Sequence, residues 1–157
     1  MEHQKKFMRE AIRLSLENVQ SGKGGPFGAV IVKNGVMIAT GVNEVTGTND
    51  PTAHAEIIAI RNACEKLDSF QLDNCEIYCS CEPCPMCLGA IYWARLKAIY
   101  FANTKQDAAE INFDDNAIYQ EMGLPINERK LPTIQLLRDE AQSAFIQWQK
   151  NDNKIDY

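Results

Sequence analysis

The spacing of apolar residues predicts that the chain begins with a helix and a two-stranded hairpin. Over residues 4–20, one face carries apolar side chains at helical spacing, namely Phe7, Met8, Ala11, Ile12, Leu16 and Val19. The glycine-rich stretch 21–26 should end this helix. The runs 28–33 and 36–41 are rich in strand-forming residues. Asn34-Gly35 between them favours a tight hairpin turn.

After the hairpin, helical and strand patterns alternate along the chain. Helices are predicted over residues 53–67, 83–95, 116–122 and 140–151, and strands over 76–80, 98–102 and 133–137. Pro83 and Pro85 fit the first turn of a helix, where proline is tolerated. Strands joined first by a hairpin and then by helices predict a mixed sheet covered by helices on both faces. No linker interrupts the pattern, so we expect one domain over residues 1–157.

Composition narrows the classes of protein to which the chain can belong. With 157 residues, 45% of them hydrophobic and 24% charged, the chain is typical of one globular domain and not of a disordered, collagen-like or coiled-coil protein. The formal charge of -5 argues against a broad nucleic-acid face. No apolar run approaches the roughly 20 residues of a membrane helix, and the N-terminus lacks the apolar core of a secretory signal. We therefore expect a cytoplasmic protein with neither a membrane nor nucleic acid as its partner.

The cysteines are crowded in a way that favours metal binding over disulfides. Five of the six lie between Cys75 and Cys87, and near neighbours in sequence do not pair easily with one another. In a reducing compartment such crowding indicates a metal site.

Two short motifs, His54-Ala55-Glu56 and Pro83-Cys84-Pro85-Met86-Cys87, can supply that site. Cys84 and Cys87 are three apart, so they share one face of a helix and can bind one ion. His54 can be the third ligand, which leaves a fourth tetrahedral position for water, as in catalytic zinc sites. We therefore expect one Zn²⁺ per chain.

The spacing of His54 and Glu56 places them at the start of a helix. Two residues apart within a helix, they would point in nearly opposite directions. They can face one site only where the backbone is not yet helical, and Pro51 just upstream supports a helix start there. Glu56 would then lie beside the metal and move protons to and from its water.

A rival interpretation of the cysteines is an iron–sulfur cluster. Cys81, Cys84 and Cys87 form the opening of a ferredoxin-type motif, but its fourth cysteine is missing and His54 and Glu56 would have no role. The other cysteines are better explained as small buried hydrophobes, namely Cys64, Cys75, Cys79 and Cys81.

With these motifs the chain resembles the cytidine deaminase-like superfamily, and within it the bacterial guanine deaminases. His-x-Glu followed by Pro-Cys-x-x-Cys is the signature of zinc nucleobase deaminases. The similarity continues through residues 24–30, 49–56, 81–95, 107–110 and 113–115. It implies an α/β fold, a three-layer α/β/α sandwich with a central mixed five-stranded sheet.

The resemblance also implies roles for particular residues. Zinc would be held by His54, Cys84 and Cys87, with Glu56 as the proton carrier. Asp115 would act on the purine as well, although Asp114 is an alternative for this position. The remaining substrate contacts would be Phe27, Asn43, Ala55, Trp93, Phe113 and Tyr157. Each has a plainer explanation: core packing for Phe27 and Trp93, a turn for Asn43, a helix cap for Asp114 or Asp115, and a frayed end for Tyr157.

The implied reaction is the zinc-dependent conversion of guanine to xanthine and ammonia, with the purine as a small-molecule partner. The resemblance further implies a homodimer whose chains exchange C-terminal segments, so that Tyr157 closes the partner's site. Alternatives are a tRNA adenosine deaminase, which would need a basic surface, and a cytosine or riboflavin-pathway deaminase. A structural zinc module is the alternative outside enzymes, but such a site has no use for Glu56.

Overall fold

The computed structural model describes residues 2–157, which fall into two compact units. The first unit ends at Asp115 and the second begins at Asn116. The elements of the first unit are α1 (Glu2–Gln20), β1 (Gly28–Lys33), β2 (Val36–Val42), α2 (Val45–Thr48), α3 (Ala55–Leu67), β3 (Cys75–Cys81), α4 (Pro85–Trp93), β4 (Ala98–Asn103) and α5 (Lys105–Glu110). All four strands and three long helices of this unit were predicted from the sequence; the short helices α2 and α5 were not.

The four strands of the first unit form a mixed sheet in the order β2-β1-β3-β4. β1 pairs antiparallel with both β2 and β3, whereas β3 and β4 are parallel. The turn between β1 and β2 is tight, because Asn34 and Gly35 both have positive φ, at 50° and 76°. Positive φ at both central residues defines the hairpin turn expected for Asn-Gly.

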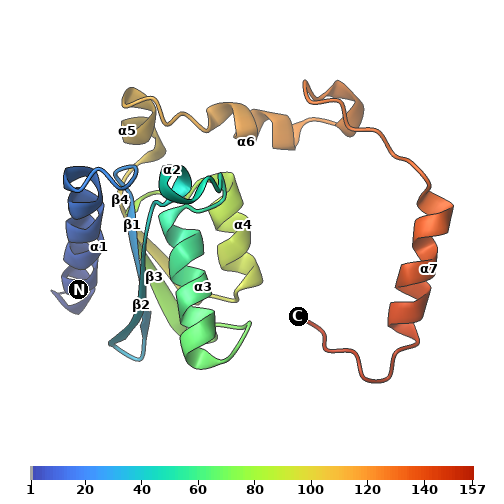
Figure 1. Ribbon diagram of the computed structural model, residues 1–157, viewed down its shortest axis with the longest axis horizontal. Helices are drawn as coiled ribbons and strands as arrows, with labels where there is room; N and C mark the ends of the chain where they lie inside the picture. The colour runs from blue at the N-terminus through green and yellow to red at the C-terminus, as the bar shows by residue number, and fades with distance from the viewer. Residues whose placement is uncertain (1) are drawn as a thin grey trace. The chain divides into compact units, whose positions relative to one another are not determined.

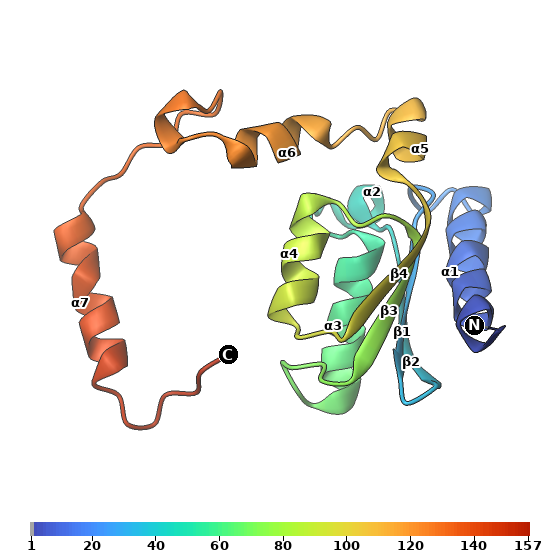
Figure 2. The same ribbon diagram turned by 180° about the vertical axis from the view of Figure 1, so that it is seen from behind.

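Helices cover both faces of this sheet, as Figures 1 and 2 show, with α1 on one face and α3 and α4 on the other. Alternate residues of β1 serve the two faces, as the two-residue period of a strand requires. Ala29 and Ile31 join the core beneath α3 and α4, while Val30 and Val32 pack with Phe7 of α1. The first unit is therefore an α/β fold with the expected three layers.

Helix α3 lies unusually close to β2. Its buried face is made of small residues, Ala55, Ala59 and Ala63, and β2 presents Gly41 beneath its first turns. A Cβ at Gly41 would overlap the carbonyl oxygen of Ala55 and lie 2.5 Å from the backbone nitrogen of Ala59. Glycine is therefore needed here to let the two backbones meet.

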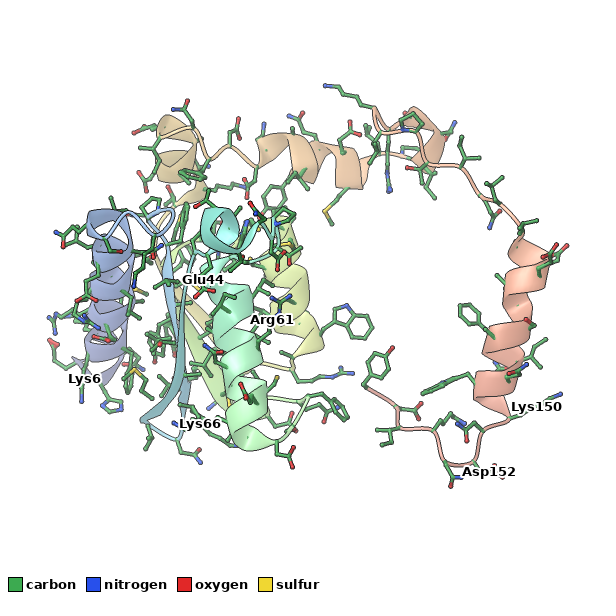
Figure 3. The ribbon with its side chains drawn as sticks, in the orientation of Figure 1. Lys6, Glu44, Arg61, Lys66, Lys150 and Asp152 are labelled. Carbon is green, nitrogen blue, oxygen red and sulfur yellow. The ribbon has the colours of Figure 1, made fainter. Side chains whose placement is uncertain are left out.

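Two side chains of α3 also join it to β2. The amide of Asn62 donates to the carbonyl oxygen of Thr40, and the ammonium of Lys66 donates to that of Ile38, both at 2.9 Å. Figure 3 labels Lys66 in the lower half of α3. Because β2 is an edge strand, these bonds occupy backbone acceptors that lack a neighbouring strand.

The second unit contains α6 (Asn116–Gly123), the 3₁₀ turn Ile126–Glu128 and α7 (Arg138–Gln149). Two of these elements match predicted helices, but the strand predicted over residues 133–137 is wrong. These residues are neither helix nor strand, so the described chain has a four-stranded sheet instead of the expected five-stranded one. A strand requires a neighbouring backbone for its hydrogen bonds, and within the described residues this segment has none; Leu137, with φ of 52°, also ends the extended run. No helix of residues 2–157 is long and apolar enough to cross a membrane.

The close contact at Gly41 gives a test of the fold. Gly41→Ala should lower the free energy of unfolding by about 2 kcal/mol or more, since overpacking typically costs roughly 1–3 kcal/mol and the obstructing atoms here are backbone. Thermal melting should show a lower Tm. Gly47→Ala is the matched control, because a Cβ there meets only the carbonyl oxygen of Lys23 at an ordinary 3.6 Å. Equal melting temperatures for Gly41→Ala and the unmodified protein would contradict the proposed backbone contact.

Candidate metal centre

Two helix N-termini supply the residues of the candidate metal site. His54 is the residue that caps α3, and Cys84 caps α4; both have extended backbones, with ψ of 156° and 169°. Neither side chain makes the usual capping hydrogen bond to its own helix. Both side chains are therefore free of their helices and can turn toward a common point. Cys87 lies on the first turn of α4 and faces the same point.

The three side chains have the separations that a zinc ion requires. The Nδ1 atom of His54 lies 3.5 Å from the Sγ atoms of both Cys84 and Cys87, and all three ligand atoms lie within 4.8 Å of one another. Tetrahedral zinc, with bonds of about 2.3 Å to sulfur and about 2.0 Å to nitrogen, separates those atoms by roughly 3.5 Å. The nitrogen of His54 is therefore spaced from each cysteine sulfur as a shared zinc ion requires.

The site also favours negative charge on sulfur. A hydrogen bond from the Cys87 thiol and another from His54 lower the pKa of Cys84 to about 4. The same hydrogen bond to Cys84, together with burial, raises the pKa of Cys87. The N-terminus of α4 also stabilises a thiolate at this position. One thiol of the pair is thus readily ionised even before a metal binds.

Glu56 lies beside these ligands, in the first turn of α3. Its side chain is buried, and its Oε2 atom lies 3.5 Å from the Sγ of Cys87. Burial raises the pKa of Glu56, because the charged carboxylate loses solvation. The structure thus places a buried carboxyl group against one of the three candidate ligands, Cys87.

Three further predicted site residues of the first unit are Phe27, Phe113 and Asp115. The rings of Phe27 and Phe113 meet edge to face, with centroids 4.9 Å apart. Phe27 also packs against the core beneath α3, so its packing role is real. Asp115 is half-buried, and partial burial and the nearby Cys84 sulfur raise its pKa, whereas Asp114 is exposed.

Asn43 is buried at the end of β2, where the backbone holds its side chain in one orientation. Its Oδ1 atom accepts from the backbone N–H groups of Gly25 and Val45, at 3.4 and 3.3 Å. Within residues 2–157, its amide nitrogen donates no hydrogen bond that the structure records. The amide can therefore donate to a bound molecule.

The three remaining predicted substrate contacts, Ala55, Trp93 and Tyr157, lie in different parts of the chain. Ala55 is buried at the first residue of α3, between His54 and Glu56. Trp93 is the last residue of α4 and is 66% exposed, so the length of that helix separates it from Cys84. Tyr157 belongs to the second unit, and its contact with a site stays a prediction.

The cysteines outside the cluster are not metal ligands in this structure. Cys81 points its thiol toward the carbonyl oxygen of Thr104, at 3.6 Å. Among residues 2–157, the metal-binding cluster contains His54, Cys84 and Cys87 and excludes Cys81. Cys75, Cys79 and Cys81 are buried, as expected for small hydrophobes, and Cys64 is partly buried.

Sequence reasoning missed one buried polar residue near the site, Asn18. It lies on the otherwise apolar face of α1 and is 4% exposed. Its Nδ2 atom donates to the carbonyl oxygens of Gly25 and Asn43, both at 2.9 Å. The sequence did contain one indication that Asn18 is buried. It lies seven residues after Ala11, and this spacing places both residues on the same face of the helix.

The profile of the cytidine and deoxycytidylate deaminase zinc-binding region matches residues 1–103 of this chain. The chain belongs to that family. Its membership agrees with the geometry above, so His54, Cys84 and Cys87 form the zinc-binding site.

Individual proteins differ in how similar they are to this chain. A guanine deaminase from Bacillus subtilis is 54% identical over 96% of this chain and 97% of its own. A crystal structure of guanine deaminase from that organism has a TM-score of 0.95 and covers 98% of both chains. A tRNA-specific adenosine deaminase from Buchnera aphidicola is 40% identical over 96% of this chain and 91% of its own.

The zinc assignment can be tested by metal analysis. The purified protein should contain about one zinc ion per chain, as a three-ligand site requires. Cys84→Ala combined with Cys87→Ala should remove it, because a single histidine remains. Cys81→Ala is the control and should retain zinc. Stoichiometric zinc in the double variant, or an iron–sulfur chromophore in the unmodified protein, would refute the assignment.

Proposed function

We propose that this protein is a zinc-dependent guanine deaminase that converts guanine and water to xanthine and ammonia. The observation that carries the proposal is a buried carboxyl group, Glu56, placed beside the three zinc ligands of a chain that is similar to a guanine deaminase over almost its whole length. A metal site that serves only to hold the fold together has no need of such a group.

The chemistry assigns Glu56 a proton-transfer role at two points. When bound, zinc would supply Lewis-acid activation of a water molecule at the open position of the site. Two cysteine sulfurs offset the charge of the metal, so a base is needed to take the proton of that water. Glu56 would accept it and pass it to N3 of guanine as the water oxygen bonds to C2. Glu56 would then take the remaining proton of that oxygen and deliver it to the amino group on C2, so that the C2–N bond breaks, ammonia leaves and a carbonyl remains at C2.

The remaining polar and aromatic groups suit the binding of a purine. Phe27 and Phe113 offer aromatic surface for the planar base, Phe113 being 47% exposed. The Asn43 amide offers a donor to the base, and the Asp115 carboxylate offers an acceptor for its N–H groups. A site built with such groups rejects a base that leaves them unpaired. These contacts rest on position in the first unit and on the family resemblance.

We propose further that the domain spans residues 1–157 and is completed in a homodimer by exchange of C-terminal segments. Each unit leaves apolar surface uncovered. β4 is an edge strand, and a groove of about 440 Å³ lies against it, lined in part by Tyr100 and Phe101. The second unit exposes large apolar side chains, namely Leu131, Ile134, Leu136, Leu137, Phe145 and Trp148. Exchange would cover apolar surface of each first unit with the second unit of the partner chain.

The proposed compartment is the cytoplasm, where the substrate would be a free purine. All six cysteines are free thiols, in keeping with a reducing environment.

The strongest alternative substrate is an adenosine in tRNA, because a relative with that name matches most of the chain. That relative is 40% identical to this chain, whereas the guanine deaminase is 54% identical. This difference and the formal charge of -5 both favour a purine base as the substrate. An RNA substrate usually needs clustered positive charge.

Enzyme assays test this function directly. The zinc-loaded protein should release ammonia from guanine and form equimolar xanthine, faster than it acts on guanosine, adenine, cytosine or a tRNA anticodon stem. Glu56→Gln should keep its zinc and lower kcat by about 10²–10⁴, the range for general acid–base catalysis. Faster inosine formation in the tRNA stem would favour the alternative. A Glu56→Gln rate within tenfold of the unmodified enzyme would show that another group moves the protons.

Asp115 and Asp114 can be separated by matched substitutions. Asp115→Asn should lower kcat/KM for guanine by about tenfold or more through loss of a charged hydrogen-bond acceptor. Asp114→Asn should have the smaller effect. Melting and zinc content serve as controls. If Asp115→Asn lowers Tm while leaving kinetics unchanged, a helix-capping role is correct instead.

The C-terminal residues offer a test of the exchanged dimer. Deletion of residues 155–157 should leave zinc and fold intact but reduce guanine turnover by about tenfold or more, because a lid that excludes water would be lost. Glu56→Gln chains, which keep the tail, should restore activity to tail-deleted chains in mixed dimers. Verified mixed dimers without activity would contradict exchange, and unchanged kinetics after deletion would show that the tail has no catalytic role.

A further inference from the structure

We propose that Asn18 is a positioning residue that fixes the amide of Asn43 toward the purine. This assignment rests on the proposed function, since it concerns the same site. Asn18 lies on α1, on the opposite face of the sheet from the helices that carry the metal ligands.

Asn18 joins three segments of the first unit by hydrogen bonds. Both of its recorded amide bonds end on loop carbonyls, those of Gly25 before β1 and Asn43 after β2, each at 2.9 Å. With 4% of its surface exposed, Asn18 makes these bonds away from competing water. Such buried bonds are costly to remove because they leave the acceptors unpaired.

The same two loops hold the side chain of Asn43. The Oδ1 atom of Asn43 accepts from the N–H of Gly25, and the N–H of Asn43 donates to the carbonyl of Phe27 at 3.2 Å. Asn18 therefore fixes the backbone on both sides of the Gly25–Asn43 contact. That contact, together with the hydrogen bond that Oδ1 accepts from the N–H of Val45, decides which way the Asn43 amide nitrogen points.

The loop is packed tightly around these bonds. A Cβ at Gly24 would overlap the carbonyl oxygen of Asn43 and lie 2.9 Å from the Nδ2 atom of Asn18. The next residue, Glu44, donates its N–H to the carbonyl of Ala53 at 2.9 Å, immediately before His54. A displacement of Asn43 would thus occur at the edge of the metal site without removing any of its ligands.

A double-mutant cycle tests whether Asn18 acts through Asn43. The zinc-loaded Glu56→Gln protein serves as the parent, since it should bind guanine without converting it, and calorimetry gives the Kd. Asn18→Ala should weaken guanine binding by about tenfold when Asn43 is present, and by no more than about twofold in the Asn43→Ala background. Zinc content should not change in any of these proteins.

Two further variants separate positioning from stability. Gly24→Ala should weaken guanine binding in the same way, because its Cβ would displace the carbonyl of Asn43. It keeps the Asn18 side chain, so it tests the loop even if Asn18→Ala fails to fold. Asn62→Ala removes an amide-to-carbonyl bond of the same 2.9 Å length, to Thr40, at an exposed position of α3, and should leave the Kd unchanged.

The outcomes are distinct. Equal losses of affinity with and without the Asn43 side chain would overturn the assignment, as would a lower Tm with an unchanged Kd for both Asn18→Ala and Gly24→Ala. Failure of the parent to bind guanine at all would overturn the proposed function, and the role of Asn18 with it.

Discussion

The site depends on the meeting of two helix N-termini at one point. A residue that caps a helix has an extended backbone, so its side chain is not fixed to the helical face of the residues that follow. His54 and Cys84 occupy such positions in α3 and α4. This geometry allows His54 and Glu56, two residues apart, to serve one site. It also places the positive ends of two helices beside the cysteine sulfurs, where negative charge must be held.

Close backbone packing keeps those N-termini in place. Gly41 lets the first turns of α3 rest directly on β2, and the alanines of α3 keep the contact short along the helix. Larger residues would lift the helix and change the separation of His54 from the cysteines of α4. The N···S distances of 3.5 Å suit one small ion only while that separation is preserved.

The sequence predicted the elements and the metal ligands better than it predicted their surroundings. The apolar residues of β1 and the helical spacing of apolar residues in α1 indicate directly which side chains are buried. The motifs around His54 and Cys84 could be recognised because they combine short sequence spacings with residue types that bind metals. The strand expected over residues 133–137 failed because pairing depends on a neighbouring backbone, which no local pattern of residues reveals. Asn18 was not predicted for a related reason. The role of a polar residue on an apolar helix face can be recognised only when its distant partners are known, here Gly25 and Asn43.

In the proposed function, the groups that would activate water are separate from the groups that would select the base. The zinc ligands and Glu56 lie at the N-terminal ends of α3 and α4, which pack on the core. Phe27 and Asn43 adjoin strand ends, and Phe113 and Asp115 follow α5. Loop residues of this kind can change without moving the metal ligands. This chain is accordingly similar both to a protein named for guanine and to one named for adenosine in tRNA. In the proposed arrangement, Asn18 acts on the base through the loops that it holds.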